Sequence, residues 1–347
     1  MVRSFLSLLA PVRAGALLIT SLAGGMVCNA QQTPRRSLLA LSKTDHTLAI
    51  VDPATLKIVA RIPVGEDPHE VIASADGRTA YVSIYGGGTL HELDVLDLVA
   101  QKPLPAVDTR PLYGPHGLVF AAGKAWFTAE GSKAVGRYDP ATGRLDWSMG
   151  TGQDRTHMLY VTADGRRIYT TNVTSGTVSI LVDTLLPAGP PQGPRSREEW
   201  RQTVIPVGRG SEGFDVSPDG RELWTAASGD GTIAIIDLQA KQLSATLEAG
   251  VQGANRLKFT PDGKQVFIAS LSTGELTIYD TRTRAAVKRL KIGHGAAGIL
   301  MDAEGARAFV ASSADNYIAI VDLKTLEVTG RLDVGGVPDG LAWAVQP

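Results

Sequence analysis

Cysteine is almost absent from this 347-residue chain, in which the only one is Cys28 near the N-terminus. If the first thirty residues are removed, no cysteine remains. That excludes a disulfide framework, a thiol nucleophile and a c-type haem attachment site. Burial of apolar side chains must then stabilise the fold.

Long apolar runs are also missing. Residues 1–30 contain two arginines, no acidic residue and an apolar run at 14–27. This pattern predicts a signal peptide cleaved after Ala30, and hence a periplasmic or secreted protein. The run is shorter than the roughly 20 residues that a membrane span needs, and no later segment is a candidate. A lipid anchor on Cys28 is the alternative.

The sequence also lacks clusters of positive charge. Without the two leader arginines, 32 basic residues face 35 acidic ones, and no basic block stands out. Binding to phosphate backbones depends on concentrated positive charge, so nucleic acid is excluded as the expected partner.

The remaining chain is built from one repeated unit. Residues 259–280 contain an apolar run, a Pro-Asp-Gly turn, a second run, a Gly turn and a third run ending in Asp. Such a pattern predicts short antiparallel strands. The turn recurs mostly every 42–46 residues, at Asp76-Gly77, Ala122-Gly123, Asp164-Gly165, Asp219-Gly220, Asp262-Gly263 and Glu304-Gly305. A period of roughly 40–45 residues is typical of a four-stranded propeller blade.

The two ends of the repeat complete one another. Residues 38–42, 48–52 and 58–64 provide the second, third and outer strands of a blade that lacks an inner strand. Residues 337–345 have the form of an inner strand and then the repeat stops. We therefore predict an all-β protein in which residues 31–347 form a seven-bladed β-propeller of four-stranded blades. Its N- and C-terminal strands jointly close the ring.

One connection is longer than the others. Residues 185–200 lie between the third and outer strands of the fourth blade and are rich in Pro and Gly. We expect a surface loop, with a docking segment carrying an exposed Trp200 as the alternative.

The repeat resembles a known family. It is similar to the YVTN repeat of YncE-like β-propellers, on the residues Tyr81-Val82-Ser83, Tyr169-Thr170-Thr171-Asn172, Phe309-Val310-Ala311, Ile50-Val51-Asp52, Ile235-Ile236-Asp237 and Ile320-Val321-Asp322. The resemblance implies the fold and an exported protein, and it implies no shared activity.

The third blade alone resembles a second family. Residues 114–118, 123–130 and 135–143 are similar to a blade of the virginiamycin B lyase family, whose members are metal-dependent seven-bladed lyases. Only this blade carries the likeness, so no catalytic residue is transferred.

A candidate site follows from the position of polar residues in the repeat. Aligning the starts of the inner strands places seven residues in one register: His69, His116, His157, Glu212, Asn255, Ala297 and Asp339. Inner strands line the channel of a propeller, so this register should form a ring around one mouth. We predict ligand binding by the six polar members and by Glu130.

Two interpretations of the ring remain open. Imidazole and carboxylate groups suit divalent transition metals, so His69, His116, His157 and Glu212 are candidate metal ligands. Alternatively, these side chains only satisfy the backbone of the neighbouring blade.

The function predicted first is binding of a small molecule or protein partner at the channel mouth, by a protein expected to act as a monomer. The alternative is a metal-dependent lyase or lactonase. In that case His116, His157 and Glu212 would hold a divalent metal ion that polarises a carbonyl, and Glu130 or another nearby group would move the proton. A structural scaffold is the third possibility.

Overall fold

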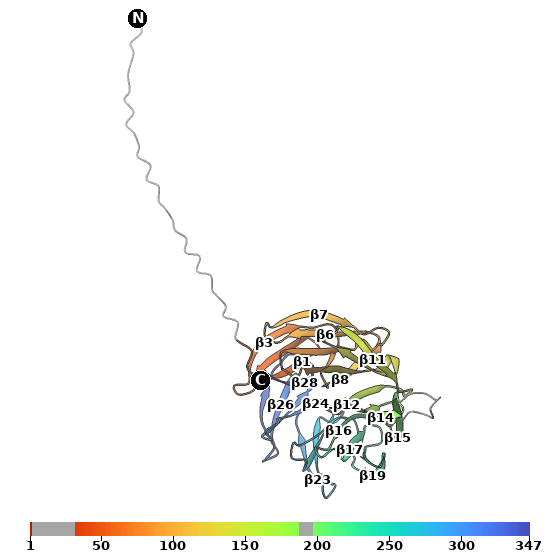
Figure 1. The fold of residues 1–347 in the computed structure, drawn as a ribbon. Helices are drawn as coiled ribbons and strands as arrows, with labels where there is room; N and C mark the ends of the chain where they lie inside the picture. Colours follow the sequence, from red (N-terminus) through yellow and green to blue (C-terminus); the bar gives the residue numbers. More distant parts are fainter. Residues whose placement is uncertain (2–31, 187–196) are drawn as a thin grey trace, which may run out of the picture. The chain divides into compact units, whose positions relative to one another are not determined.

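The computed structural model describes Met1 and residues 32–186 and 197–347, so the predicted signal peptide lies outside the described residues. Within these ranges the structure has 28 β-strands and three single-turn 3₁₀ helices. The strands form seven four-stranded antiparallel sheets arranged in a ring (Figure 1). The predicted seven-bladed propeller is confirmed.

Each blade is described from its inner to its outer strand. Blade 1 is β28 (Pro338–Val345), β1 (Arg36–Ser42), β2 (Thr47–Asp52) and β3 (Lys57–Pro63). Blade 2 is β4 (Pro68–Ala73), β5 (Thr79–Ile84), β6 (Glu92–Asp97) and β7 (Lys102–Asp108). Blade 3 is β8 (Pro115–Ala121), β9 (Lys124–Ala129), β10 (Ala134–Asp139) and β11 (Arg144–Gly150). Blade 4 is β12 (Thr156–Val161), β13 (Arg167–Asn172), β14 (Thr177–Leu186) and β15 (Arg197–Pro206).

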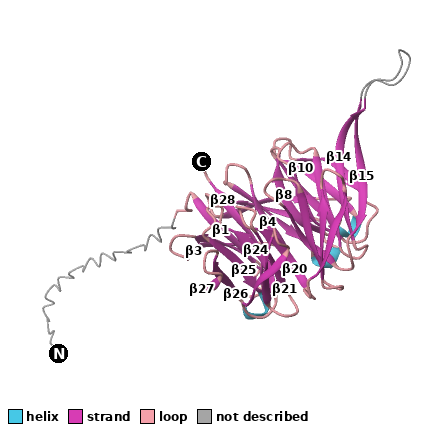
Figure 2. Cartoon of the chain, turned by 90° about the horizontal axis from the view of Figure 1, so that it is seen from below, coloured by secondary structure: helices cyan, strands magenta, loops and turns pink. Residues whose placement is uncertain are grey.

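The last three blades follow without interruption. Blade 5 is β16 (Ser211–Val216), β17 (Glu222–Ala227), β18 (Thr232–Asp237) and β19 (Gln242–Glu248). Blade 6 is β20 (Ala254–Phe259), β21 (Gln265–Ser270), β22 (Glu275–Asp280) and β23 (Ala285–Lys291). Blade 7 is β24 (Ala296–Met301), β25 (Arg307–Ser312), β26 (Tyr317–Asp322) and β27 (Glu327–Leu332). The 3₁₀ helices η1 (Gly86–Gly88), η2 (Glu130–Ser132) and η3 (Ser313–Asp315) join second to third strands. These three helices lie on the face opposite the projecting end of the β14–β15 hairpin (Figure 2).

The Asp-Gly turns fold through local hydrogen bonds. In blade 6, a carboxylate oxygen of Asp262 accepts hydrogen bonds from the Thr260 hydroxyl at 2.7 Å and the Lys264 amide at 3.1 Å. Gly263 follows with φ of 70°, a conformation that glycine adopts without steric cost. The side chain thereby fixes the hairpin between the first two strands from within the turn itself.

The core is divided among the seven blade interfaces. Seven clusters of buried apolar residues are found, and each joins two neighbouring blades. Between blades 1 and 2, for example, Leu48 and Ile50 pack against Ala80 and Val82, and all four are fully buried. A single blade cannot bury these faces alone, so every blade depends on both neighbours.

Closure of the ring also follows the prediction. The C-terminal β28 pairs antiparallel with the N-terminal β1, in a register that places Leu39 opposite Ala342 and Arg36 opposite Val345. The Trp343 ring lies 5.6 Å from the ring of Phe309 in blade 7, with the Arg36 guanidinium 4.3 Å above it. Both chain ends are therefore needed to complete blade 1 (Figure 1).

The predicted loop at 185–200 is partly wrong. β14 runs to Leu186 and β15 begins at Arg197, so both ends of the segment belong to a long hairpin. Residues 187–196 lie outside the described residues. Trp200 is half-buried, and its ring lies 4.9 Å from the Trp147 ring of blade 3. This contact between blades supports the longer strand, and Trp200 is not an exposed docking residue.

Candidate functional site

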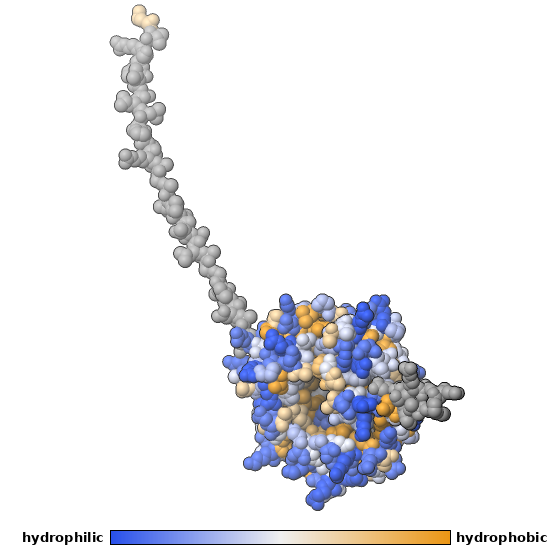
Figure 3. All heavy atoms as spheres, in the orientation of Figure 1, coloured by the Kyte–Doolittle hydropathy of each residue, from blue (hydrophilic) through white to orange (hydrophobic). Residues whose placement is uncertain are grey.

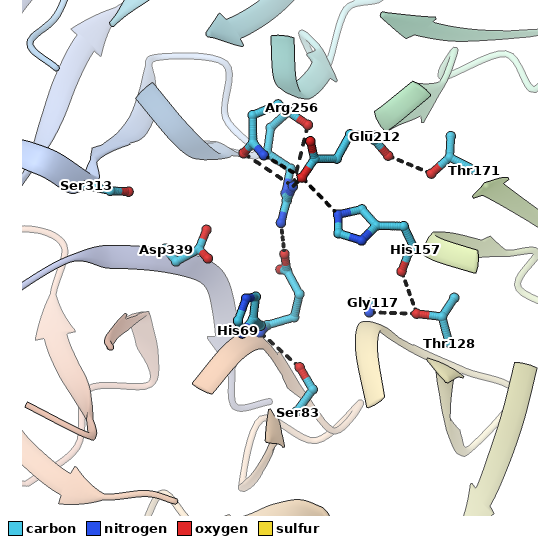
Figure 4. Close-up of polar contacts among 12 residues, drawn as sticks. His69, Ser83, Gly117, Thr128, His157, Thr171, Glu212, Arg256, Ser313 and Asp339 are labelled. Carbon is cyan, nitrogen blue, oxygen red and sulfur yellow. Dashed lines mark hydrogen bonds and ion pairs between the residues drawn. The ribbon is translucent and has the colours of Figure 1, made fainter. Parts of the chain in front are cut away.

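The seven residues of the predicted ring meet at one mouth of the channel. Each is the second residue of its inner strand and follows a Pro, Thr, Ser or Ala. A cavity of about 220 Å³ opens there. Figure 4 shows His69, His157, Glu212 and Asp339 arranged around it. It is lined by Lys43, His69, Tyr85, His116, Arg155, His157, Glu212, Asn255, Arg256, Leu271, Ala297, Ser313, Val337 and Asp339. We call it the mouth cavity.

His157 lies between two carboxylates. Its Nδ1 contacts an oxygen of Glu130, and its Nε2 lies 3.2 Å from Oε1 of Glu212 without the alignment of a hydrogen bond. The other oxygen of Glu130 accepts a hydrogen bond from the Tyr85 hydroxyl. Glu212 Oε1 also accepts from the Asn255 amide at 2.9 Å. Together with His157, these four side chains form one continuous polar network, which joins the inner strands of blades 4, 5 and 6 to the turns after β5 and β9.

The pKa values of this network agree with an imidazolium between two ionised acids. Burial lowers the pKa of His157, but the contacts with Glu130 and Glu212 outweigh it and the net shift is upward. Burial raises the pKa of each carboxyl, but the contact with His157 outweighs it and the net shift is downward. The carboxylates therefore stabilise the fold above their ordinary pKa, and this contribution is lost as the pH falls through their lowered values.

The other two histidines of the ring are neutral. Burial is the main cause that lowers the pKa of His116 well below its usual range, and the charge of His157 adds to it. Burial, followed by the neighbouring Lys43, also lowers the pKa of His69. The three rings contact one another in sequence at tilted angles, with 4.7 Å between the centroids of His69 and His116 and 3.9 Å between those of His116 and His157.

His116 has a nitrogen without a partner. Its Nδ1 is buried and makes no hydrogen bond within the described residues, although the ring lines the mouth cavity. His69 is fully engaged, since its Nε2 lies 2.7 Å from Lys43 Nζ and its Nδ1 lies 3.1 Å from the Asp67 carbonyl oxygen. Lys43 Nζ also donates to Asp339 at 3.3 Å. The orphaned His116 nitrogen is thus hydrogen-bonding capacity that the described chain does not use.

A constriction closes the bottom of the mouth cavity. The next register along the inner strands holds four glycines, because a Cβ at Gly213 or Gly298 would lie 2.3 or 2.1 Å from a carbonyl oxygen of the adjacent strand. The inner strands therefore approach closely. Across this narrow level, Arg256 of blade 6 donates to Glu70 of blade 2 at 2.5 Å (Figure 4). Burial lowers the pKa of Arg256, but Glu70, Asp339 and Glu212 outweigh it, so the guanidinium is charged.

A second cavity lies on the other side of this ion pair. It has a volume of about 360 Å³ and is walled mostly by apolar side chains, among them Phe120, Tyr160 and Trp343. Hydrophobic residues surround the hollow at the centre of the face seen in Figure 3. The channel is thus divided into a polar mouth and an apolar one, with Arg256 lining both.

The predicted site residues are brought together with one exception. His69, His116, His157, Glu212, Asn255 and Asp339 all line the mouth cavity, whereas Glu130 lies behind His157 and does not line it. Within the described ranges, no group of three or more His, Cys, Asp or Glu side chains has the geometry to hold a metal ion. The reason is visible at His157, where both ring nitrogens face carboxylates. Metal binding stays a prediction.

Several cavity residues lie outside the predicted ring. Lys43 and Tyr85 come from turns between second and third strands, Arg155 from the turn before β12, and Arg256 from the register below the ring. Among these residues only Arg256 had a signal in the sequence, which it shares with its partner Glu70. They replace, in blades 2 and 6, the glycine that follows the ring position in four other blades.

Comparisons with known proteins give the fold. No protein-family model and no curated protein matches this chain. A functionally unknown protein from Desulfotomaculum acetoxidans is similar in structure, with a TM-score of 0.71 and 13% identity over 90% of this chain and 99% of that one. A protein provisionally assigned as a 6-phosphogluconolactonase from Bacteroides uniformis has a TM-score of 0.70 and 15% identity, over 89% and 100%.

A third similar structure is hydrazine synthase of Kuenenia stuttgartiensis, with a TM-score of 0.63 and 16% identity over 79% of this chain and 89% of that one. In the described part of the chain, no helix is long and apolar enough to cross a membrane. At sequence identities this low, a structural similarity shows the fold and does not show an activity. The chain is a seven-bladed β-propeller with a polar, histidine-lined channel mouth.

Proposed function

We propose that this protein is exported and that its mouth cavity binds a small polar molecule. The observation that carries the proposal is the buried Nδ1 of His116, which has no hydrogen-bond partner within the described residues. Leaving such a group unsatisfied costs about 1–3 kcal/mol. A ligand group that bonds it would remove this cost. The volume of about 220 Å³ suits a small molecule rather than a protein segment.

The charged side chains around the cavity are held in place before binding. Lys43, Arg256 and His157 are already held by carboxylates, so the polar walls are ordered before a ligand arrives. A site that is ordered in advance loses little conformational freedom on binding.

The test replaces His116 by a ring without nitrogens. Screening by thermal shift against sugars, hydroxy acids, amino acids and lactones should identify compounds that stabilise the wild type. In His116→Phe the affinity for these compounds should fall about 10-fold or more, since one hydrogen bond to a buried group is lost. His91→Ala is the control, because His91 faces Asp108 at 3.2 Å and does not line the cavity. Equal affinity of wild type and His116→Phe would contradict the proposal.

A second candidate is a metal-dependent lyase or lactonase at the same mouth. It is favoured by the convergence of three imidazoles and Glu212 on one cavity, and by the structural similarity to the protein provisionally assigned as a lactonase. A divalent ion would act there as a Lewis acid. His157 would first have to release Glu130 and Glu212.

Calorimetric titration of metal-stripped protein with zinc, copper, nickel and manganese tests this candidate. Stoichiometric binding is expected, with most of it lost in His116→Ala and in His157→Ala but not in His91→Ala. The affinity should fall as the pH drops, because only neutral imidazole coordinates metal. The raised pKa of His157 means that this loss begins above the ordinary imidazole pKa. The absence of binding by all four metals would eliminate the candidate.

A further inference from the structure

The turn that leads into each inner strand has the same backbone conformation in all seven blades. Two residues before the ring position, φ is positive and lies between 51° and 76°, at Asp67, Gly114, Arg155, Gly210, Gly253, Gly295 and Val337. Glycine adopts this left-handed conformation freely, whereas a side chain makes it costly. Four blades have the expected glycine and three do not.

The three exceptions all have side chains at the mouth. Arg155 and Val337 line the mouth cavity, and Asp67 Oδ1 lies 3.6 Å from Lys43 Nζ. Aspartate tolerates the left-handed region through local hydrogen bonds, but arginine and valine gain nothing there from the backbone. Strained residues that persist in this way cluster at ligand-binding sites. Arg155 is the charged one of the two.

The guanidinium of Arg155 has free donors. Its side chain is 48% exposed and makes no hydrogen bond within the described residues. Its closest acid is Glu130, whose Oε2 lies 3.6 Å from the Arg155 Nε and already accepts from the Tyr85 hydroxyl. Lys43 and Arg256, by contrast, donate to Asp339 and Glu70. Arg155 is therefore available to an external acceptor.

We propose that Arg155 binds an anionic oxygen group of the ligand, a carboxylate or a phosphate, and that His116 Nδ1 bonds a hydroxyl at its other end. A guanidinium matches both oxyanions with two parallel hydrogen bonds. This inference rests on the proposed function of the mouth cavity and names its ligand class. The ligand is a small molecule that carries one anionic group and at least one hydroxyl.

The distribution of charge fixes the orientation of such a ligand. Five carboxylates, from Asp67, Glu70, Glu130, Glu212 and Asp339, surround the mouth, against four cations when His157 is protonated. A second negative charge deep in the cavity would be repelled. The anionic group must then lie at the rim beside Arg155, with the uncharged hydroxyl end directed toward His116.

Three compounds with one carbon skeleton test the ligand class. Isothermal titration should detect binding of D-glycerate or of glycerol 3-phosphate, and glycerol should bind at least tenfold more weakly. Comparison of the first two compounds distinguishes a carboxylate from a phosphate. Glycerol binding as tightly as either anion, or no binding of either anion, would overturn the inference. The proposed function would survive that result if uncharged compounds bound in a manner that depends on His116.

Arg155→Gly tests the residue. Affinity for the bound anion should fall at least tenfold, while the melting temperature should stay constant or rise by a few degrees because the backbone strain is removed. Arg155→Lys should retain part of the affinity, since it keeps the positive charge and loses the two parallel hydrogen bonds that a guanidinium can donate. Unchanged anion affinity in Arg155→Gly would overturn the assignment.

Lys241→Gly is the matched control. Lys241 is exposed, has φ of 53° and lies in the turn between β18 and β19, where it does not line the mouth cavity. The substitution removes the same charge and the same type of backbone strain. It should change stability in the same direction as Arg155→Gly and leave anion binding intact.

Discussion

A chain that ends at Val337 is expected to lose its cooperative fold or to melt roughly 10–20 °C below the full chain. The missing β28 provides the inner strand of blade 1, including the buried Ala342 and Ala344. Its loss exposes the edge of β1 and opens the apolar clusters between blades 1 and 2 and between blades 7 and 1. We expect a cost of about 5 kcal/mol or more, comparable with the whole stability of many domains.

Thermal unfolding followed by circular dichroism measures this effect. A chain that ends at Val345 is the control, because it keeps β28 and loses only the hydrogen bond from the Gln346 amide to the Arg35 carbonyl at 2.7 Å. That loss should cost about 1 kcal/mol or less. Identical melting of the full chain and the chain ending at Val337 would show that β28 does not close the ring.

The fold could be predicted because its information is local and repeated. The turn at 260–265 fixes its own hairpin through Thr260 and Asp262, and five other turns use the same position in the blade. The hairpin of β14 and β15 could not be predicted in the same way. It is extended by a contact between Trp200 and Trp147 of another blade, which leaves no periodic signal in the sequence.

Only those residues of the candidate site that lie in the repeat register could be predicted from the sequence. Counting along the repeat placed His116 and His157 in one ring, and closure of the propeller turned that ring into a cavity. Lys43, Tyr85 and Arg155 lie in turns whose direction the register does not determine. The mutual contacts of the histidine rings and the position of Glu130 behind His157 depend on side-chain packing. The repeat register carries no information on that packing.

The ion pair at the constriction should be the most sensitive single contact in the channel. The Arg256 side chain is only 8% exposed, and it donates to Glu70 at 2.5 Å and to Asn255 Oδ1 at 3.3 Å. Its guanidinium also lies 4.0 Å from Glu212 Oε1. Removing one partner of a buried ion pair leaves the other charge uncompensated in a poorly solvated place.

Arg256→Met is therefore expected to destabilise the protein by about 3–5 kcal/mol, with a fall in melting temperature of roughly 10 °C. The double variant Glu70→Leu/Arg256→Met should recover most of this loss, because an apolar pair of similar volume needs no compensating charge. Denaturant unfolding of the wild type, both single variants and the double variant gives the coupling energy between the two residues. If the two single losses simply add in the double variant, Glu70 and Arg256 do not stabilise one another across the channel, and the constriction depends on the close approach at Gly213 and Gly298 alone.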